Sequence, residues 1–290
     1  MADDATDYRA WIGSAETRDD LIAEAQVEAI AATLDLPTDA LGTGDPLPPL
    51  WHWFYFLPRA ATSALGSDGH PPKGGFMPPV DLPRRMFAGA RVRFPAPLLI
   101  GRPATREGEV VNVAEKHGGS GRLAFVTVRY RVVQDSRVCI EEEQDIVYRE
   151  PGATVPAPQA LDAWPAAPEG AWTKVVTPDP RLLFRFSALT FNAHRIHYDR
   201  PYAMAEEGYP GLVVHGPLTA LLLLHLARDN AGRPVAGYTF RGKAPLFDLG
   251  PFRLIGTQQT GPDGQAQVAL EAQGPDGKTA MTATADLAAS

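Results

Sequence analysis

Four of the seven histidines in this 290-residue chain fall between positions 194 and 225. Imidazole has the unperturbed pKa nearest to neutrality, so histidine is the usual group for proton transfer. Three interpretations of His194, His197 and His215 are open: a metal site, a set of structural histidines in a polar turn, and an acid–base site. No Cys or Glu completes a known zinc spacing here, so we predict no metal. His225 lies within an apolar helical stretch, where a structural role is favoured.

The residues around these histidines favour the acid–base interpretation. Asn192 precedes His197 by five positions, and its amide can hold a water molecule with one donor and one acceptor. Gly216 and Pro217 follow His215 directly and open the apolar stretch. Proline is at home in the first turn of a helix, where backbone N–H groups point outward. An N–H at Gly216 is therefore a predicted oxyanion site for a thioester carbonyl. Asp199 precedes Arg-Pro and is predicted to be a helix cap.

These segments resemble a known family, the MaoC-like hydratases of the (R)-specific enoyl-CoA hydratase 2 group. The resemblance rests on LTFNAHRIHYDRPYA, which ends at residue 203, and on VVHGPLTALLL, which begins at residue 213. His197 falls on the family's catalytic histidine and Asp199 on its helix-start aspartate. The chain departs from the usual pattern in two places, because Asn192 stands where the catalytic aspartate is expected and His194 where an asparagine is expected.

The variant TFNAHRIHYD is similar to one sub-branch of that family. This sub-branch holds the 3-hydroxyacyl-thioester dehydratases of type 2 and the mesaconyl-C4-CoA and itaconyl-CoA hydratases, whose chains are about as long as this one. LPRRMFAGARVRF (82–94) also resembles them. The resemblance implies an α+β double hot-dog fold, with two antiparallel sheets that each wrap around a central helix. It also implies a coenzyme A thioester as the substrate, bound between the two halves.

The implied reaction is the reversible addition of water to a 2-enoyl thioester, without a metal or redox cofactor. The catalytic residues would be His197 as the base, Asn192 beside it, and Gly216 as the oxyanion donor. A mesaconyl or itaconyl group carries a free carboxylate, which calls for an arginine. Substrate-binding candidates are His194, His215, Arg84, Arg85 and Arg241, with the adjacent pair Arg84 and Arg85 favoured among the arginines.

Three alternatives remain open. A general (R)-3-hydroxyacyl-thioester dehydratase would take simple acyl chains. A hot-dog thioesterase would need an acidic residue near the central helix, and none occurs between Pro210 and Ala227. A binding module without catalysis would not need His197 at all.

The strand and helix patterns place these residues in two halves. We predict a degenerate, dehydratase-like hot-dog half over 1–150, a Pro/Ala-rich linker over 151–171 and a catalytic hot-dog half over 172–290. Helices are expected at 14–34, 202–207 and 217–228, and a buried aromatic wall or strand at 51–58. A long Pro/Gly-rich loop covers 66–85, and loops of that length are often functional. Strands are expected over 88–149, with turns at 118–121 and 134–137, and at 182–189, 235–247, 251–260, 266–273 and 278–287.

Composition excludes several other classes. Lys plus Arg total 27 against 34 Asp plus Glu, a net charge of −7, which argues against a nucleic-acid partner. The single cysteine, Cys139, excludes a disulfide framework and a zinc site built from cysteines within one chain. The apolar stretch 212–227 is too short to cross a membrane, and the N-terminus has no apolar signal region. We therefore expect a cytoplasmic enzyme with an acyl-CoA substrate and no membrane partner, and allow for a homodimer.

Overall fold

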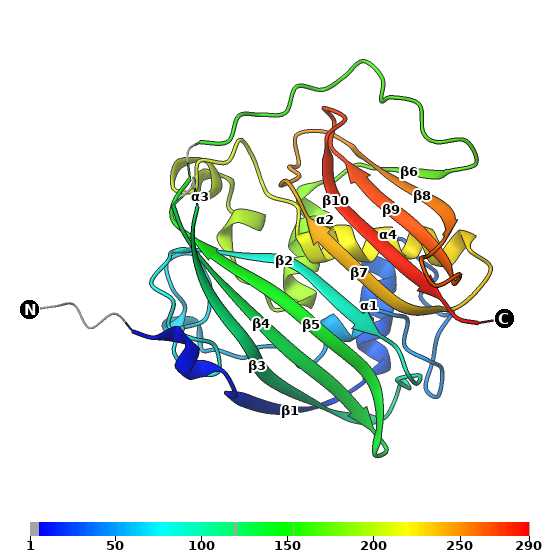
Figure 1. Ribbon diagram of the computed structural model, residues 1–290, viewed down its shortest axis with the longest axis horizontal. Helices are drawn as coiled ribbons and strands as arrows, with labels where there is room; N and C mark the ends of the chain where they lie inside the picture. Colours follow the sequence, from blue (N-terminus) through cyan, green and yellow to red (C-terminus); the bar gives the residue numbers. More distant parts are fainter. Residues whose placement is uncertain (1–5, 119–120, 153, 290) are drawn as a thin grey trace, which may run out of the picture.

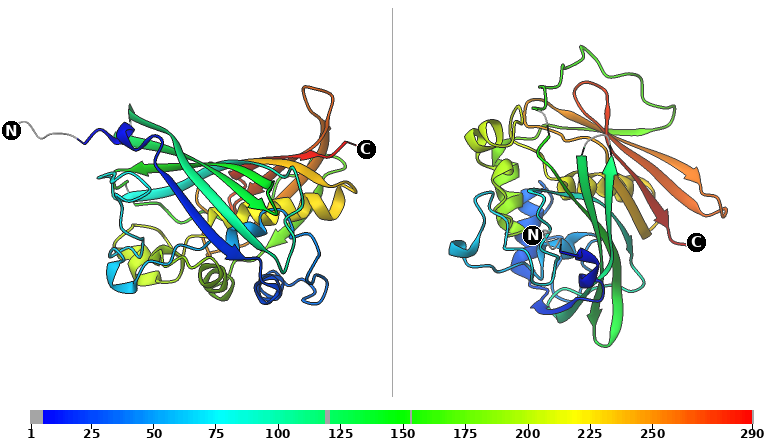
Figure 2. Two further views of the ribbon diagram at one scale, coloured as in Figure 1. Left: turned by 90° about the horizontal axis from the view of Figure 1, so that it is seen from below. Right: turned by 60° about the vertical axis from the view of Figure 1, so that its left-hand side comes forward.

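The computed structural model describes residues 6–118, 121–152 and 154–289. One antiparallel sheet runs through the molecule, and the helices lie on one side of it (Figures 1 and 2). In spatial order the strands are β1 (Ala15–Leu21), β3 (Pro103–Gly118), β4 (Gly121–Gln134), β5 (Arg137–Arg149), β2 (Arg84–Arg93), β7 (Val235–Gly242), β10 (Thr279–Leu287), β9 (Ala266–Gln273), β8 (Phe252–Thr260) and β6 (Trp172–Val176).

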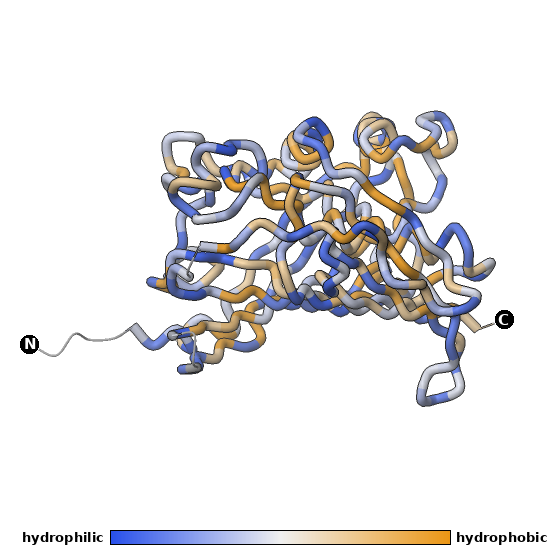
Figure 3. The backbone as a smooth tube through the Cα atoms, turned by 90° about the horizontal axis from the view of Figure 1, so that it is seen from above, coloured by the Kyte–Doolittle hydropathy of each residue, from blue (hydrophilic) through white to orange (hydrophobic). Residues whose placement is uncertain are grey.

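The pairing of β2 with β7 joins strands from the two halves of the chain into this one sheet. Gly89 lies opposite Arg241 and Arg93 opposite Gly237 in that register. All strands on one side of the junction come from residues before 150, and all those on the other side from residues after 171. The layer of helices covers the same face of both parts, as the edge-on view in Figure 3 shows. One hydrophobic core extends under both parts, with Ile30 and Leu254 in the same cluster.

Helix α4 (Gly216–Asn230) is the central helix of the C-terminal part. Leu218, Leu221 and Leu224 are fully buried, and the helix packs against β6 to β10. A helix that is apolar on nearly all sides needs such an environment. The buried helix predicted at 217–228 is therefore confirmed.

The long helix predicted over 14–34 is wrong. Residues Ala15–Leu21 form the edge strand β1, and only Glu24–Thr33 form a helix, α1. The charged residues of β1 alternate between exposed and half-buried positions, and two of them have partners on β3: Arg106 donates to Glu16, and Thr105 to Asp19. These cross-strand pairs stabilise a sheet edge, whereas a helix would expose most of the same side chains. Helix α1 packs beside α2 and not alone under the N-terminal strands.

The strand predicted at 182–189 is also wrong, because Pro180–Leu189 form helix α2. Asp179 caps this helix by accepting from the backbone N–H groups of Arg181 and Leu182. The buried residues Leu183, Phe186 and Ser187 share the i, i+3, i+4 face of a helix. Asp179 followed by proline is a helix-start signal that outweighs the short apolar run.

The short helix near 202–207 is confirmed as α3 (Arg200–Ala205), and the strands at 235–287 correspond to β7 to β10. The turn at 134–137 is confirmed, with Asp135 and Ser136 at positive φ. The predicted turn at 118–121 contains residues 119 and 120, which lie outside the described residues. Residues 154–171 contain no helix or strand and run over the surface between β5 and β6 (Figure 1).

The aromatic run at 51–58 is largely buried, as predicted, but its first four residues form a 3-10 helix (Trp51–Phe54) and not a strand. Two further 3-10 helices precede the site, at Tyr8–Trp11 and Thr62–Ala64. No helix in the described part of the chain is long and apolar enough to cross a membrane.

Candidate active site

His197 lies in a 3-10 turn (Arg195–His197) between α2 and α3, and its ring is almost completely buried. Its Nδ1 lies 2.7 Å from the carbonyl oxygen of Val213, which only accepts, so Nδ1 carries the proton and Nε2 has a free lone pair. Burial is the main cause that lowers the His197 pKa to about 4, and the nearby His70 adds to the effect. At neutral pH His197 is therefore a neutral imidazole whose Nε2 can accept a proton.

His215 lies directly against His197. The two rings stack at 3.6 Å between centroids and 18° between planes. His215 Nε2 is 2.8 Å from the hydroxyl oxygen of Ser187 on α2, and only 1% of the residue is exposed. Burial, together with His197 and His194, holds the His215 pKa well below its usual range. These contacts favour a role in positioning His197 over the direct substrate contact that we predict from the sequence.

Gly216 is the first residue of α4, and His215 precedes it as the N-cap residue. The first N–H groups of a helix have no partner within the helix, and the positive end of the helix dipole lies there. A Cβ built on Gly216 would meet only the carbonyl oxygen of Phe87, at 3.8 Å. Other segments therefore do not crowd the start of α4 at Gly216, and the Gly216 N–H stays a candidate oxyanion donor.

Asn192 and His194 form a tight turn ahead of His197. The Oδ1 of Asn192 accepts from the backbone N–H of His194 at 3.0 Å, so this oxygen already has a partner. The amide NH₂ is the part of Asn192 that remains to hold a water molecule. Burial lowers the His194 pKa to about 2, and the charges of His70 and His197 contribute to the shift. His194 is thus a neutral ring that stands edge-on to His197, with 5.5 Å between centroids.

The three candidate arginines do not come together. Arg84 pairs with Glu207, with Nε 3.2 Å from the carboxylate, and also donates to the Glu207 carbonyl. Arg85, its neighbour on β2, points to the other face, where it lies opposite the buried Tyr148. Neighbouring residues of a strand point to opposite faces, so the adjacent pair cannot act as one clamp. Arg85 has no hydrogen bond or ion pair within the described residues, and its charge contributes to the lowered pKa of His194.

Arg241 is on the wrong side of the sheet for the predicted role. It is exposed, whereas its neighbour Phe240 is buried on the inner face. Its charge acts on Asp145, which pairs with Arg91 on the outer face. We therefore withdraw Arg241 as a substrate-binding candidate.

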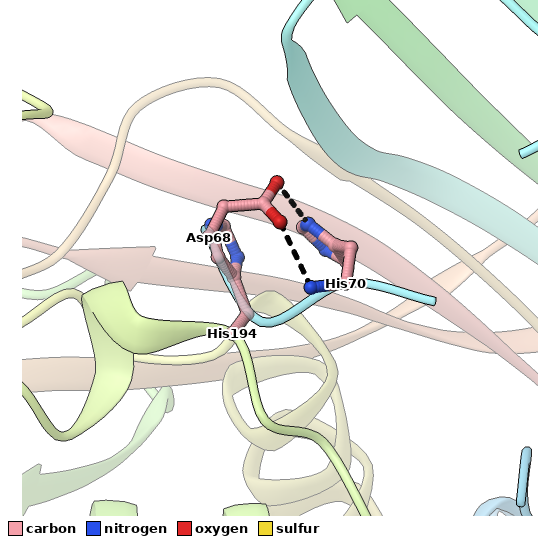
Figure 4. Close-up of side chains that lie close together, drawn as sticks. All are labelled: Asp68, His70 and His194. Carbon is pink, nitrogen blue, oxygen red and sulfur yellow. Dashed lines mark hydrogen bonds and ion pairs between the residues drawn. The ribbon is translucent and has the colours of Figure 1, made fainter. Parts of the chain in front are cut away.

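Sequence reasoning missed two residues that the structure brings to the site, Asp68 and His70. They lie in the Pro/Gly-rich loop of the N-terminal half, and the rings of His70 and His194 are 4.1 Å apart (Figure 4). The ligand atoms of Asp68, His70 and His194 all lie within 4.8 Å of one another, which is a geometry that a transition metal could occupy. The length of the loop was a signal for function, but nothing in it indicated which residues face the site.

Two structural roles are confirmed. Trp51 Nε1 donates to His225 Nε2 at 3.0 Å, so His225 is a satisfied core histidine, separate from the cluster. Asp199 accepts from the backbone N–H of Tyr202 and caps α3.

Known proteins similar to this chain agree with the fold. A family model described as hydroxyacyl-thioester dehydratase type 2 matches residues 50–248. The mesaconyl-C(4)-CoA hydratase of Chloroflexus aurantiacus is 62% identical over 98% of this chain and 99% of its own length. The mitochondrial hydroxyacyl-thioester dehydratase type 2 of Schizosaccharomyces pombe is 29% identical over 81% of this chain and 87% of its own. A solved MaoC-like dehydratase superposes with a TM-score of 0.71 over 98% of this chain and all of its own, at 16% identity.

The chain belongs to the hydroxyacyl-thioester dehydratase type 2 family, and it has the double hot-dog fold of MaoC-like proteins. It is an enzyme of the acyl-CoA hydratase and dehydratase class. These findings confirm the family, the fold class and the enzyme class predicted from the sequence. The domain boundaries and the roles of the site residues stay predictions.

Proposed function

We propose that this enzyme adds water to a 2-enoyl-CoA whose acyl group carries a second carboxylate, with mesaconyl-C4-CoA as the substrate. The 62% identity to a mesaconyl-C(4)-CoA hydratase along nearly the whole of both chains supports this substrate. The observation that carries the chemistry is the buried, neutral His197, whose Nδ1 is bonded to Val213 and whose ring stacks on His215, the residue before Gly216.

His197 acts as the base in the proposed reaction. Its Nε2 takes a proton from water as the water oxygen attacks the β-carbon of the enoyl thioester. Val213 holds the ring in the tautomer that this step needs, and His215 holds it in place from one face. The NH₂ group of Asn192 donates a hydrogen bond to the attacking water and so orients it.

The electrons of the double bond then move toward the thioester carbonyl. The negative charge that develops on its oxygen is stabilised by the Gly216 N–H at the start of α4. Protonation of the α-carbon completes the addition, and the product is a 3-hydroxyacyl thioester. No redox change takes place, and we propose that the reaction needs no cofactor besides the coenzyme A of the substrate.

Arg85 recognises the free carboxylate. In mesaconyl-C4-CoA this carboxylate is attached to the β-carbon, close to the reacting bond. Arg85 is half-buried on the inner face of the sheet and has no partner in the described part of the chain. An unpaired guanidinium matches a carboxylate with two parallel hydrogen bonds. Arg84, which is already paired with Glu207, instead fixes the segment that follows α3.

A general 3-hydroxyacyl-thioester dehydratase is the second candidate. The family description and the relative from Schizosaccharomyces pombe favour it, because their names specify no dicarboxylic acyl group. Such an enzyme would use the same His197 and Gly216 but would not need a guanidinium beside the β-carbon. The behaviour of Arg85 therefore separates the two candidates.

The test is a hydration assay that follows the absorbance of the enoyl thioester with mesaconyl-C4-CoA and crotonyl-CoA in parallel, together with a thiol reagent. We expect hydration of mesaconyl-C4-CoA, at least tenfold slower hydration of crotonyl-CoA, and no free thiol. Faster turnover of crotonyl-CoA would support the general dehydratase. Release of thiol from either substrate would contradict both candidates and indicate a thioesterase.

A further inference from the structure

Four histidine rings lie close together in the site: His70, His194, His197 and His215. Asp68 and His70 form a hydrogen-bonded pair at the edge of this histidine cluster (Figure 4). His70 Nδ1 lies 2.9 Å from one carboxylate oxygen of Asp68, and the backbone N–H of His70 donates to the other oxygen at 2.9 Å. The hydrogen bond from His70 is the main cause that holds the pKa of Asp68 well below its usual range. The carboxylate is therefore ionised, so Nδ1 of His70 donates to it and Nε2 is left for another partner.

The loop that carries this pair is fitted tightly against the catalytic segment. The backbone N–H of Arg195 donates to the carbonyl oxygen of Asp68 at 2.9 Å, and its guanidinium donates to the Ser67 carbonyl at 3.0 Å. Gly69 has φ of +90°, and a Cβ at this position would lie only 1.8 Å from the carbonyl oxygen of Ala193. The close approach of these two backbones fixes His70 beside His194.

The four clustered histidines differ in the charge of their partners. His197 donates to a neutral carbonyl, and His215 contacts the neutral hydroxyl of Ser187. His194 is a neutral ring between the other members of the cluster. Among these four, only His70 is hydrogen-bonded to an ionised carboxylate, that of Asp68. His70 is also about 18% exposed at its side chain, so it can exchange protons with solvent.

We propose that His70, held by Asp68, is the general acid of the reaction and acts opposite the base His197. This inference rests on the proposed hydration. The Nε2–H of the His70 imidazolium gives its proton to the α-carbon of the enolate, and His197 keeps the proton taken from water. His197 then releases that proton to solvent and His70 takes one up, so the net change is the addition of one water molecule to the double bond. In the dehydration direction the two rings exchange roles.

Other titratable and charged groups around His70 come from several elements. Asp68 and Lys73 lie on its own loop, Arg85 on β2, His194 ahead of the catalytic turn and Glu207 after α3. The ammonium of Lys73 donates to two backbone carbonyls of the same loop, at Val80 and Leu82. Asp68 is therefore the one carboxylate hydrogen-bonded to the His70 ring, within the described residues.

The test compares His70→Gln and Asp68→Asn with the wild type in the hydration assay, with Asp81→Asn as the matched control. Asp81 ends the same loop but is exposed and bonds to Tyr8 and Arg122. General acid catalysis contributes about 10²–10⁴-fold, so we expect His70→Gln to lower kcat at least 100-fold with KM changed less than threefold. Asp68→Asn should lower kcat less than His70→Gln does, and the alkaline limb of the kcat–pH profile should shift to lower pH. Asp81→Asn should stay within twofold of the wild type.

Chemical rescue guards against misfolding as the cause. His70→Ala should regain at least tenfold activity when free imidazole is added, whereas a variant that fails to fold would not respond. A kcat of His70→Gln within threefold of the wild type, or no rescue of a folded His70→Ala, would overturn the inference but leave the proposed hydration intact. A wild-type enzyme that hydrates neither enoyl thioester would overturn both.

Discussion

Substitution of Gly69 by alanine tests how the N-terminal loop supports the active site. A Cβ at this position would lie 1.8 Å from the carbonyl oxygen of Ala193, whereas real Cβ contacts are essentially never below 3.0 Å. The obstacle is backbone, so no side-chain rotation relieves it. The loop must therefore move away from the catalytic segment by about 1.2 Å or more, the difference between these two distances.

The cost of Gly69→Ala has two parts. A left-handed φ costs about 1–2 kcal/mol for alanine relative to glycine. The displacement also breaks the two hydrogen bonds from Arg195 to the carbonyls of Asp68 and Ser67, each worth about 1 kcal/mol net. The expected loss of unfolding free energy is about 3–4 kcal/mol. A misplacement of about 1 Å in a catalytic constellation can cost about 100-fold, so we expect kcat/KM to fall by that factor.

Gly74→Ala is the matched control, because Gly74 lies in the same loop with φ of +95° but would place its Cβ 3.4 Å from Pro79, an ordinary contact. It should lose only the conformational part, about 1–2 kcal/mol, and keep kcat/KM within threefold of the wild type. Urea unfolding and the hydration assay measure both effects. If Gly69→Ala behaves like Gly74→Ala in both measurements, the loop does not position the site and the reasoning is refuted.

Three further predictions concern recognition, pH and metals. Arg85→Gln should raise the KM for mesaconyl-C4-CoA at least tenfold, because hydrogen bonds to charged groups contribute about 1.5–3 kcal/mol. The KM for crotonyl-CoA should stay unchanged. Equal effects on both substrates in steady-state assays would argue against a carboxylate contact. Burial lowers the His225 pKa to about 3, so the unfolded state binds more protons below pH 6.5 and the unfolding free energy should fall as the pH falls. His225→Gln should reduce that slope between pH 6 and 4 by about 1.4 kcal/mol per pH unit in urea titrations, and an unchanged slope would contradict the assignment. Hydratase activity should survive dialysis against EDTA. Added Zn²⁺ should inhibit the wild type more than it inhibits Asp68→Asn. A loss of activity on dialysis that Zn²⁺ restores would indicate a metal site and contradict the acid–base account of the cluster.

The candidate catalytic residues that are close in sequence could be proposed from the sequence alone. Asn192, His197 and Gly216 come from one segment with a recognisable pattern, and the buried helix that follows is apolar on nearly every side. The capping role of Asp199 follows from its place before Arg-Pro. Local chemistry determines such features, and a single sequence is sufficient to indicate them.

The features that the sequence did not reveal depend on contacts between distant segments or on a competition between local signals. Gly69 lies against the backbone of Ala193, which is more than a hundred residues further along the sequence. No pattern within the loop indicates this partner. The arginine pair at 84 and 85 is different, because strand alternation alone would have separated the two side chains. In α2 the cap at Asp179, followed by proline, outweighs the short apolar run that predicts a strand.

The most direct test of the account is a single-turnover measurement with mesaconyl-C4-CoA in which wild type and His197→Gln are compared at saturating enzyme. The absorbance of the enoyl thioester should fall with the wild type, without release of thiol. The rate should drop at least 1,000-fold in His197→Gln while the substrate still binds. A His197→Gln enzyme that hydrates the substrate at a rate within tenfold of the wild type would contradict the assignment of His197 as the base.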